Sequence, residues 1–418
     1  MSDDSRNTRL RVVAAGFIGN VLEWYDFAVY GFFAATVGAL FFPSEDHTAS
    51  LIAAFGAFAL GFVMRPLGAI LFGHIGDRFG RRRLMICSSL AMALSTFAIG
   101  ILPTYAAIGP AAAVLIIVLR MIQGLSVGGE YLGSGVFLAE TAPPRRRGFI
   151  SSFATAGLFA GLLLGSSVGA LVSHVLTADQ VAAWGWRLPF LAGLLLGGVV
   201  LVLRFGVAEA PLPEKRLRAP LIEAVTRHGR DITLAAATIM AMGASWYVAV
   251  IYLPTWMVRH LGFTRAYTLE INAANMAIAA IAGLALAALS DRIGRKPVLL
   301  TSMAGLAVFT YPMLWLISQG DPKVVAAAQC VLVIFSGSCA FVLPATFAEM
   351  FPWAVRTTST NLSLNLTFAI FGGTAPVVAT WLVARTGDLA ALAIYLSVLG
   401  ILSTIACLFL KERRGIEL

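Results

Sequence analysis

The chain has 418 residues, of which 59% are hydrophobic and only 12% are charged. A soluble domain carries about 25% charged residues, so this chain has too little charge to cover a water-exposed globule of its size. A transmembrane helix needs about 20 apolar residues, and the roughly 247 hydrophobic residues could build about twelve. The composition predicts a multi-pass membrane protein. It excludes a soluble enzyme, a disordered chain and, despite the net charge of +9, a nucleic-acid-binding domain.

Apolar stretches bounded by charged residues, Pro or Gly follow one another along the whole chain. In the first half they lie at roughly 12–42, 51–75, 84–103, 111–139, 149–173 and 187–207. In the second half they lie at roughly 232–258, 268–289, 298–317, 323–347, 358–384 and 389–410. Helices are the only open-ended structures that satisfy their backbone polar groups in lipid, so we expect twelve transmembrane helices. The first stretch contains Glu23 and Asp26, which a signal-peptide core would lack, so we expect it to be retained.

The basic residues predict the orientation in the membrane. If the N-terminus is cytoplasmic, most Lys and Arg residues fall in the inner loops and tails, as the positive-inside rule requires. We therefore expect a protein of a bacterial-type plasma (inner) membrane with both termini in the cytoplasm. The longest polar segment, 208–231, is rich in Pro and basic residues. We expect it to be a cytoplasmic linker between a six-helix bundle at 1–207 and a second one at 232–418.

Two loop motifs occur once in each half of the chain. The motif GHIGDRFGRRR (Gly73–Arg83) follows the second span, and AALSDRIGRK (Ala287–Lys296) follows the eighth. Similarly, AETAPPRRRG (Ala139–Gly148) follows the fourth span, and AEMFPWAVR (Ala348–Arg356) follows the tenth. The two pairs recur at offsets of 214 and 209 residues, so both are in nearly the same register. This predicts a duplicated six-helix unit, an architecture in which transporters bind substrate where the repeats meet near mid-membrane.

The motifs and the six-plus-six layout resemble the major facilitator superfamily. More narrowly, four stretches resemble its metabolite:proton symporters: GNVLEWYDFAVYGF (Gly19–Phe32), MRPLGAILFGHIGDRFGRR (Met64–Arg82), LRMIQGLSVGGEYLGSGVFLAE (Leu119–Glu140) and WGWRLPF (Trp184–Phe190). That branch contains carriers of citrate and other di- and tricarboxylates, oxoglutarate, shikimate, and proline or betaine. The resemblance implies an all-α, twelve-helix carrier that works by alternating access. We expect it to function as a monomer in the bilayer, with the proton as coupling ion and without a cofactor.

Five ionisable residues fall inside the expected spans: Glu23 and Asp26 in the first, Arg65 in the second, Arg120 and Glu130 in the fourth. Each would cost about 2.5–3.5 kcal/mol if it faced lipid, so we expect them to be paired or to line a hydrated cavity. Counting about 1.5 Å per residue from the loop motifs places all five at mid-membrane or somewhat above it. We expect Asp26, Glu23 and Glu130 to take part in proton coupling.

Asp26 and Arg120 are the expected coupling pair. A carboxylate beside an arginine stays ionised, and it accepts a proton more readily once an anionic substrate has taken the guanidinium. Proton and anion then favour each other's binding, which is the linkage that a symporter needs. The resemblance points the same way, because related sugar–proton symporters place a proton-carrying Asp and an Arg at the matching positions. Glu23 lies three residues before Asp26 on nearly the same helix face, where it either shares the proton or bonds the bundle together.

Arg65 is the second candidate ligand for an anion, with Glu130 a candidate resting partner. Away from the ends of its spans, the second half contains no charged residue, so we expect it to supply shape and neutral contacts. The further candidate substrate contacts are Tyr25, Tyr30, Gln123, Tyr247, Tyr252 and Asn275. Such uncharged polar residues also serve as hydrogen-bonding links between helices.

The loop motifs provide the expected gate. Its residues are Asp77, Arg78, Arg81 and Glu140 in the first half, and Asp291, Arg295, Glu349 and Arg356 in the second. An acid that ends a span can complement the dipole of a neighbouring helix. We expect Arg81 to pair with Glu140 and Arg295 with Glu349, joining the halves. The resemblance implies that this network closes the cytoplasmic side. Charge that only sets topology would explain the arginines, but not the repeated acids.

Together these features predict proton-coupled symport of a small organic acid. A carrier of a zwitterion such as proline or betaine is the first alternative. Arg120 argues against it, because the betaine/proline members of the branch carry Lys at the matching position, and the tail after Lys411 lacks the heptad extension expected of an osmosensing carrier. Few polar side chains lie in the inner half of the fifth span, Ser151–Ser173, which disfavours a large polycarboxylate.

A proton-antiporting exporter of drugs or metabolites is the second alternative, because it shares the fold and the first loop motif. A membrane-embedded enzyme is not expected, since the chain has no HExxH, GxSxG or Asp/His metal cluster. The four cysteines lie singly inside apolar runs and imply neither metal nor redox chemistry.

Overall fold

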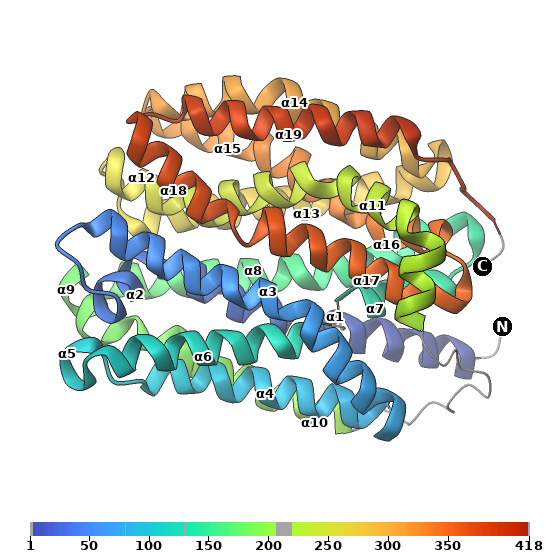
Figure 1. Cartoon of the computed structure of the whole chain (residues 1–418), viewed down its shortest axis with the longest axis horizontal. Helices are drawn as coiled ribbons and strands as arrows, with labels where there is room; N and C mark the ends of the chain where they lie inside the picture. Colours follow the sequence, from blue (N-terminus) through green and yellow to red (C-terminus); the bar gives the residue numbers. More distant parts are fainter. Residues whose placement is uncertain (1–2, 80, 129–130, 206–219, 417–418) are drawn as a thin grey trace.

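The protein is a long bundle of helices that run mainly along one direction (Figure 1). The computed structural model describes residues 3–79, 81–128, 131–205 and 220–416, and within these ranges all regular structure is helical. The beginning of α1 and the segment that follows α19 lie at one end of the bundle. We call this end, which holds Glu140, Asp291 and Glu349 of the repeated motifs, the motif end. The opposite end, with α5 and α9, is the far end.

The helices of the first half account for its expected spans, some of them broken into two pieces. They are α1 (Asp3–Phe32), α2 (Ala34–Phe41), α3 (His47–Phe79), α4 (Arg81–Ile101), α5 (Tyr105–Ile108), α6 (Pro110–Val127), α7 (Tyr131–Thr141), η1 (Pro144–Arg146), α8 (Arg147–Val175), α9 (Ala178–Gln180), the π-helix η2 (Val181–Gly185) and α10 (Arg187–Phe205).

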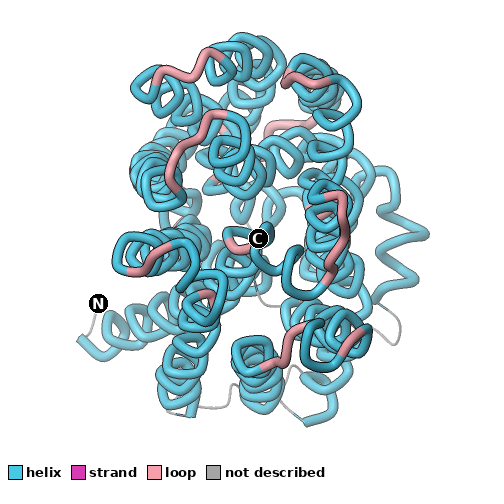
Figure 2. The backbone as a smooth tube through the Cα atoms, turned by 90° about the vertical axis from the view of Figure 1, so that its left-hand side faces the viewer, coloured by secondary structure: helices cyan, strands magenta, loops and turns pink. Residues whose placement is uncertain are grey.

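The second half is interrupted more often, by short 3-10 and π segments. Its elements are α11 (Pro220–Tyr247), the π-helix η3 (Val248–Tyr252), α12 (Leu253–His260), α13 (Arg265–Ile293), α14 (Arg295–Ser318), α15 (Pro322–Gly337), η4 (Ser338–Phe341), α16 (Leu343–Met350), η5 (Trp353–Val355), α17 (Arg356–Thr367), the π-helix η6 (Phe368–Gly372), α18 (Ala375–Thr386) and α19 (Ala390–Phe409). Figure 2 looks along the bundle and shows these helices nearly end-on.

The helices are long and apolar enough to cross a membrane several times. Nine runs among the described residues meet this condition, and up to eleven do if each of two bent pairs is one span. The bent pairs are Phe17–Phe32 with Ala34–Phe41, at 64°, and Ala178–Gly185 with Arg187–Val202, at 50°. The third expected span corresponds to the shorter apolar helix Ile86–Ile101. The predicted all-α, multi-pass membrane fold is therefore confirmed.

The expected linker differs from the structure in its second part. Residues 206–219 lie outside the described ranges, but α11 already begins at Pro220, so residues 220–231 are helical and continuous with the seventh span. Proline suits the first turn of a helix, where its missing N–H leaves no bond unmade.

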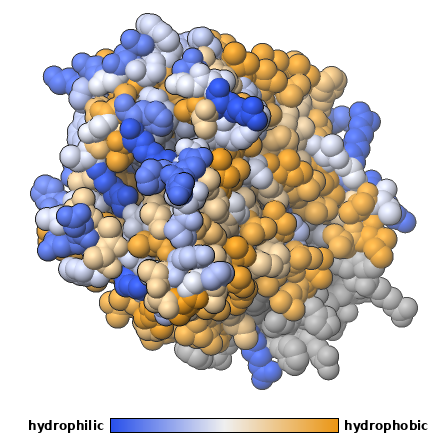
Figure 3. Space-filling view, turned by 60° about the vertical axis from the view of Figure 1, so that its left-hand side comes forward, coloured by the Kyte–Doolittle hydropathy of each residue, from blue (hydrophilic) through white to orange (hydrophobic). Residues whose placement is uncertain are grey.

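The outer surface of the bundle carries many large apolar side chains. The most exposed include Leu195, Val202, Ile281, Val175 and Phe409. Figure 3 shows a broad apolar flank, with polar residues gathered at the end of the bundle that faces the viewer. Exposed apolar surface on this scale indicates contact with another apolar phase, and the lipid bilayer provides it here.

Close contacts between helix backbones position the charged side chains. A Cβ atom at Gly124 of α6 would collide with the carbonyl of Gly61 on α3, and one at Gly128 would collide with the carbonyl of Arg65. Small residues allow membrane helices to approach in this way. The same contact between α3 and α6 brings together the two helices that carry Arg65 and Arg120. Between the halves, α8 packs against α13, and α3 packs against α17 and α18.

We expect Gly124→Ala to destabilise the carrier, because the added methyl group must push α3 and α6 apart. Overpacking of this kind costs about 1–3 kcal/mol. Thermal unfolding of the purified protein in detergent would measure the effect. Gly198→Ala is the matched control, since a Cβ atom at Gly198 in α10 would meet no atom within 4 Å. Equal unfolding temperatures for the two variants would contradict the assigned contact.

Candidate functional site

Four of the five charged residues expected within the spans lie buried in the first half. The exposed fraction is 4% for Glu23, 0% for Asp26, 1% for Arg65 and 0% for Arg120. They come from α1, α3 and α6. Glu130, the fifth, lies outside the described residues.

The guanidinium group of Arg120 rests on aromatic rings rather than on a carboxylate. Its central carbon lies 4.3 Å from the ring centroid of Tyr30 and 4.6 Å from that of Phe27. Its Nη1 donates a hydrogen bond to Gln123 Oε1 at 2.7 Å. Its Nε and Nη2 are buried and have no hydrogen-bond acceptor among the described residues. Arg120 thus keeps two donor atoms available.

Arg65 is held in a similar way and also lies over the ring of Phe27. Its guanidinium carbon lies 4.1 Å from the ring centroid of Phe62 and 4.5 Å from that of Phe27. Among the described residues, Nε and Nη2 of Arg65 also have no acceptor. Glu23 and Tyr247 interact with Arg65 electrostatically. The ring of Phe27 is therefore shared by two cations.

Asp26 and Arg120, the expected coupling pair, are not joined by a hydrogen bond, and their role in coupling stays a prediction. Neither carboxylate oxygen of Asp26 accepts a hydrogen bond from Arg120, and the two interact only electrostatically. A chain of hydrogen bonds lies between them: Gln123 Nε2 donates to Thr96 Oγ1 at 2.7 Å, and Thr96 lies beside Asp26. The aromatic rings and Gln123 together hold the guanidinium of Arg120 away from the carboxylate.

Aromatic side chains from both halves enclose the two arginines. Tyr247 of α11 packs on Phe62 of α3 with ring centroids 5.1 Å apart, and Phe368 of η6 lies 6.5 Å from Phe62. Phe58 joins them, with its centroid 5.1 Å from that of Phe62. We call the rings of Phe27, Tyr30, Phe58, Phe62, Tyr247 and Phe368 the aromatic cage. Its last two members come from the second half, so the cage lies where the halves meet.

Three of the expected substrate contacts point elsewhere. The hydroxyl of Tyr25 donates to the carbonyl of Pro189 at 2.7 Å. Asn275 donates to the carbonyl of Ala326 at 3.1 Å and to Gln329 Oε1 at 3.2 Å. Tyr252 lines a separate small pocket nearer the far end. Tyr30, Gln123 and Tyr247, in contrast, do lie around the buried arginines.

Neither Thr96 nor the phenylalanines of the cage were among the site residues expected from the sequence. Phe58 and Phe62 are four residues apart, and Phe27 directly follows Asp26. The available signal was therefore phenylalanines at helical spacing and next to a charged residue of a span. Aromatic residues are also common in apolar helices that only pack against neighbours. For this reason the sequence alone does not distinguish the phenylalanines of the cage from those that only pack.

At the motif end, arginines and glutamates pair reciprocally between the halves. Arg147 of the first half contacts Glu349 of the second at 3.0 Å, and Arg356 of the second contacts Glu140 of the first at 2.6 Å. The expected Arg295–Glu349 pair is present at 3.1 Å, but it lies within the second half. Arg147 was not among the expected gating residues. Its signal was the repeat itself, because Arg147 and Arg356 each follow a motif glutamate by seven residues.

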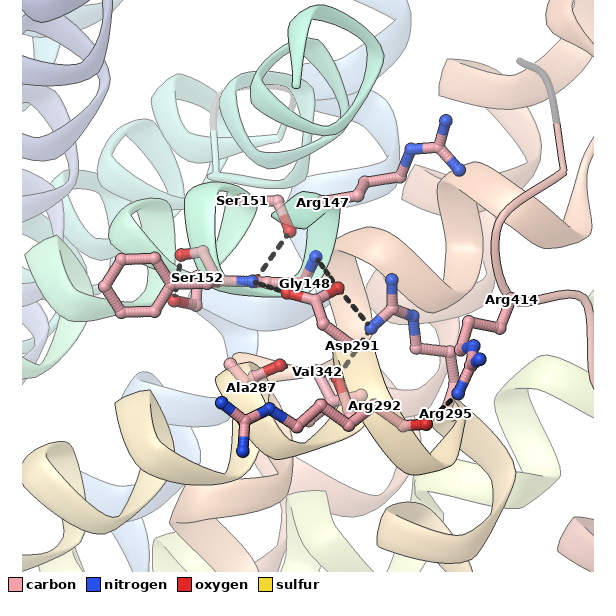
Figure 4. Close-up of polar contacts among 12 residues, drawn as sticks. Arg147, Gly148, Ser151, Ser152, Ala287, Asp291, Arg292, Arg295, Val342 and Arg414 are labelled. Atoms are coloured by element: carbon pink, nitrogen blue, oxygen red, sulfur yellow. Dashed lines mark hydrogen bonds and ion pairs between the residues drawn. The ribbon is translucent and has the colours of Figure 1, made fainter. Parts of the chain in front are cut away.

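Asp291 joins the same network through the start of α8. Its carboxylate accepts hydrogen bonds from the backbone N–H of Gly148 at 2.8 Å and of Phe149 at 2.9 Å, and from Arg295 Nη1 at 2.8 Å (Figure 4). An acid at a helix N-terminus complements the helix dipole, as the sequence suggested for this position. The side chains of Asp77, Arg78 and Arg81 lie outside the part that the structure describes, and so does the expected Arg81–Glu140 pair.

The halves are also bonded together at the far end. Arg265 Nη1 donates to Thr36 Oγ1 at 2.9 Å, and Arg259 Nη2 donates to the carbonyl of His47 at 3.2 Å. With the reciprocal pairs at the motif end, contacts between the halves exist on both sides of the cage. The buried arginines are therefore enclosed in this conformation.

Comparison with known proteins identifies the family. Residues 12–212 match the family described as "Sugar (and other) transporter", and residues 234–417 match "Major Facilitator Superfamily". The proline/betaine transporter of Salmonella typhimurium is 32% identical over 96% of this chain and 83% of its own length. The putative proline/betaine transporter of Staphylococcus aureus is 34% identical over 97% of this chain and 89% of its own. The chain belongs to the major facilitator superfamily.

Within this superfamily, the relatives confirm the metabolite:proton symporter branch that the motifs indicated. A further relative is the glycine betaine/proline/ectoine/pipecolic acid transporter of Dickeya dadantii, 32% identical over 98% of this chain and 84% of its own length. The fold matches the partially occluded, inward-open xylose transporter from E. coli with a TM-score of 0.77, at 18% identity, over 98% of this chain and 99% of that one. The protein is a secondary transporter and not an enzyme. The names of its relatives favour the zwitterion alternative over the expected organic acid.

We expect Glu349→Gln to weaken the motif end strongly. The change leaves two buried arginines, Arg147 and Arg295, without their shared carboxylate, and breaking a buried pair in this way costs about 3–5 kcal/mol. Thermal unfolding should show a large drop in stability. Glu223→Gln is the control, because the Glu223–Arg227 pair spans 3.7 Å and the side chain of Arg227 is 76% exposed. A similar, small effect of both changes would contradict a structural role for the buried cluster.

Proposed function

We propose that the protein takes up a small zwitterion of the proline/betaine class together with protons, by alternating access. One observation carries the proposal: two buried guanidinium groups lie on aromatic faces with donor atoms left over. The printed names of the relatives, which are proline and betaine transporters, support the same substrate class.

The carboxylate of the substrate would bind the arginines. Buried donors without acceptors are costly, and Nε with Nη2 of Arg120 forms the fork that binds a carboxylate in a bidentate way. Arg65 offers the same pair of atoms. A carboxylate that enters the cage satisfies these donors and neutralises part of the buried charge.

The cationic part of the substrate would bind the aromatic cage. Ring faces attract quaternary ammonium groups as they attract guanidinium groups. In the present conformation, the rings of Phe27, Phe62 and Tyr30 are covered by the two arginines. Once a carboxylate draws a guanidinium aside, a ring face becomes free for the ammonium group of the same molecule.

Arg120 does not separate zwitterions from organic acids, because both present a carboxylate. Arg at position 120 in place of Lys therefore does not disfavour betaine. The aromatic cage discriminates better, since a dicarboxylate has no cationic group for the ring faces and its second carboxylate would meet Asp26 and Glu23 nearby.

Proton coupling would depend on Asp26. Its carboxylate is fully buried and shares the electrostatic field of Arg120. When the substrate carboxylate takes over Arg120, Asp26 loses stabilisation of its charged form and binds a proton more readily. Substrate and proton then bind cooperatively.

The reciprocal pairs at the motif end would serve as the gate on one side of the membrane. With both termini in the cytoplasm, as the basic loops predict, this is the cytoplasmic gate. The halves 1–207 and 232–418 would rock about the cage, so that the pairs at the motif end and the bonds at the far end break in turn.

We expect Asp26→Asn to abolish proton-driven accumulation while substrate exchange across the membrane continues. The amide cannot take up the coupling proton, but it keeps nearly the same shape. Uptake and counterflow of labelled glycine betaine in proteoliposomes with an imposed pH gradient would measure both activities. Asp179→Asn, at an exposed position in α9, should behave as wild type. Accumulation of substrate by Asp26→Asn at the wild-type level would refute the coupling role.

The substrate class is tested by competition. Glycine betaine and proline should inhibit labelled betaine uptake, whereas succinate should not. Phe62→Leu should weaken betaine binding by roughly tenfold, because a cation on an aromatic face gains about 1–2 kcal/mol. Phe309→Leu, a half-exposed position on α14 outside the cage, is the matched control. Strong inhibition by succinate with none by betaine would favour the organic-acid function instead.

A further inference from the structure

A small hollow lies inside the first half, apart from the interface between the halves. It is formed by α1, α4 and α6, and Glu23, Ser88, Ser89, Met92 and Ser126 line it. Its space is close to what one water molecule needs. Three serines and a glutamate thus line a cavity that has no part in enclosing the aromatic cage.

The hollow lies between Asp26 and the motif end. Helix α4 starts at the motif end, and Ser88 comes seven residues after Arg81, which is about 10 Å along the helix. Helix α6 runs the other way, and Ser126 is next to its last residue, Val127. On α1, Glu23 lies one turn closer to the motif end than Asp26 does.

Polar groups connect the hollow with Asp26. Met92, which lines the hollow, accepts a hydrogen bond at its carbonyl from Thr96 at 3.0 Å. Thr96 in turn lies beside Asp26 and accepts from Gln123. Glu23 itself lines the hollow and lies three residues before Asp26 on the same helix.

The lining suits proton transfer. A serine hydroxyl is one donor and two acceptors, so Ser126, which donates to the carbonyl of Ile122 at 2.7 Å, still has lone pairs for a water. A carboxylate within reach of a water can accept a proton and return it. The side of the cage that faces the second half is covered by Tyr247 and Phe368, which offer no comparable row of hydroxyls.

We propose that the proton leaves Asp26 through this hollow, with Glu23 as the relay, while the substrate leaves between the two halves. The neutral Asp26 carboxyl gives its proton to the Glu23 carboxylate, directly or through one water, and becomes a carboxylate in the field of Arg120. Glu23 then gives the proton to water on the motif side. The inference rests on the proposed proton coupling, and it adds a separate route for the proton.

A separate route has a measurable consequence. Deprotonation of Asp26 does not require the cage to open, so the proton can leave before or after the substrate. Blocking the hollow should therefore slow every transport mode that needs deprotonation. A carrier that stays protonated can still exchange bound for free substrate, because this exchange does not need deprotonation.

The test replaces serines that line the hollow with valine. In proteoliposomes, Ser126→Val and Ser89→Val should lower the downhill efflux of labelled glycine betaine at least tenfold, while betaine exchange at equal pH stays within about twofold. Ser95→Val is the control, because Ser95 is a buried serine on α4 that bonds the carbonyl of Ala91 and does not line the hollow. It should change neither rate.

Glu23 is tested by the ratio of the two rates. Glu23→Gln should lower the ratio of efflux to exchange at least tenfold, and Glu23→Asp should restore part of it. Wild-type efflux in all hollow variants would overturn the inference. So would an equal loss of efflux and exchange in Glu23→Gln, since Glu23 would then support Arg65 and substrate binding. A wild-type carrier that moves betaine without moving protons would instead contradict the proposed function.

Discussion

The guanidinium groups of Arg65 and Arg120 are buried in the first half, and neither donates a hydrogen bond to a carboxylate among the described residues. Charges removed from water are costly unless the protein compensates them, and most of the surrounding structure does so. Aromatic faces hold both Arg65 and Arg120. Gln123 and Thr96 lie between Arg120 and Asp26 and extend the electrostatic field of the arginine to the carboxylate. The glycine contacts of α6 keep α3 and α6 close enough for the ring of Phe27 to contact both cations. The two guanidinium groups still lack a hydrogen-bonded anion, which a bound ligand could supply.

The motif end and the aromatic cage use the duplicated architecture in opposite ways. At the motif end the duplication is kept, since each half contributes the arginine that pairs with the glutamate of the other half. Both reciprocal ion pairs must therefore break when the halves separate at this end. In the cage the symmetry is lost, because all the buried charges belong to the first half and the second half contributes rings. Symmetric contacts suit rocking, and an asymmetric site suits one substrate with two unlike ends.

Much of the fold could be predicted from the sequence, because lipid demands long apolar helices and repeated loop motifs reveal duplication. The burial of Asp26 and Arg120 also followed from their place inside long apolar stretches. Their mutual orientation did not, since depth along a helix says nothing about the direction in which a side chain points around it. For the same reason Tyr25 and Asn275 were expected in the site but bond to neighbouring helices. Phe62 was overlooked because a phenylalanine in an apolar span looks the same whether it packs or binds.

The backbone contact between α3 and α6 has a mechanical consequence. Because Gly124 and Gly128 seat one helix directly on the other, the attachment points of Arg65 and Arg120 form a rigid pair that travels as a single body. Rocking of the halves can change what covers this pair, but not the spacing between its members. In the proposed mechanism, the first half would hold the anionic end of a ligand at a fixed spacing, and Tyr247 and Phe368 of the second half would select for ligand length.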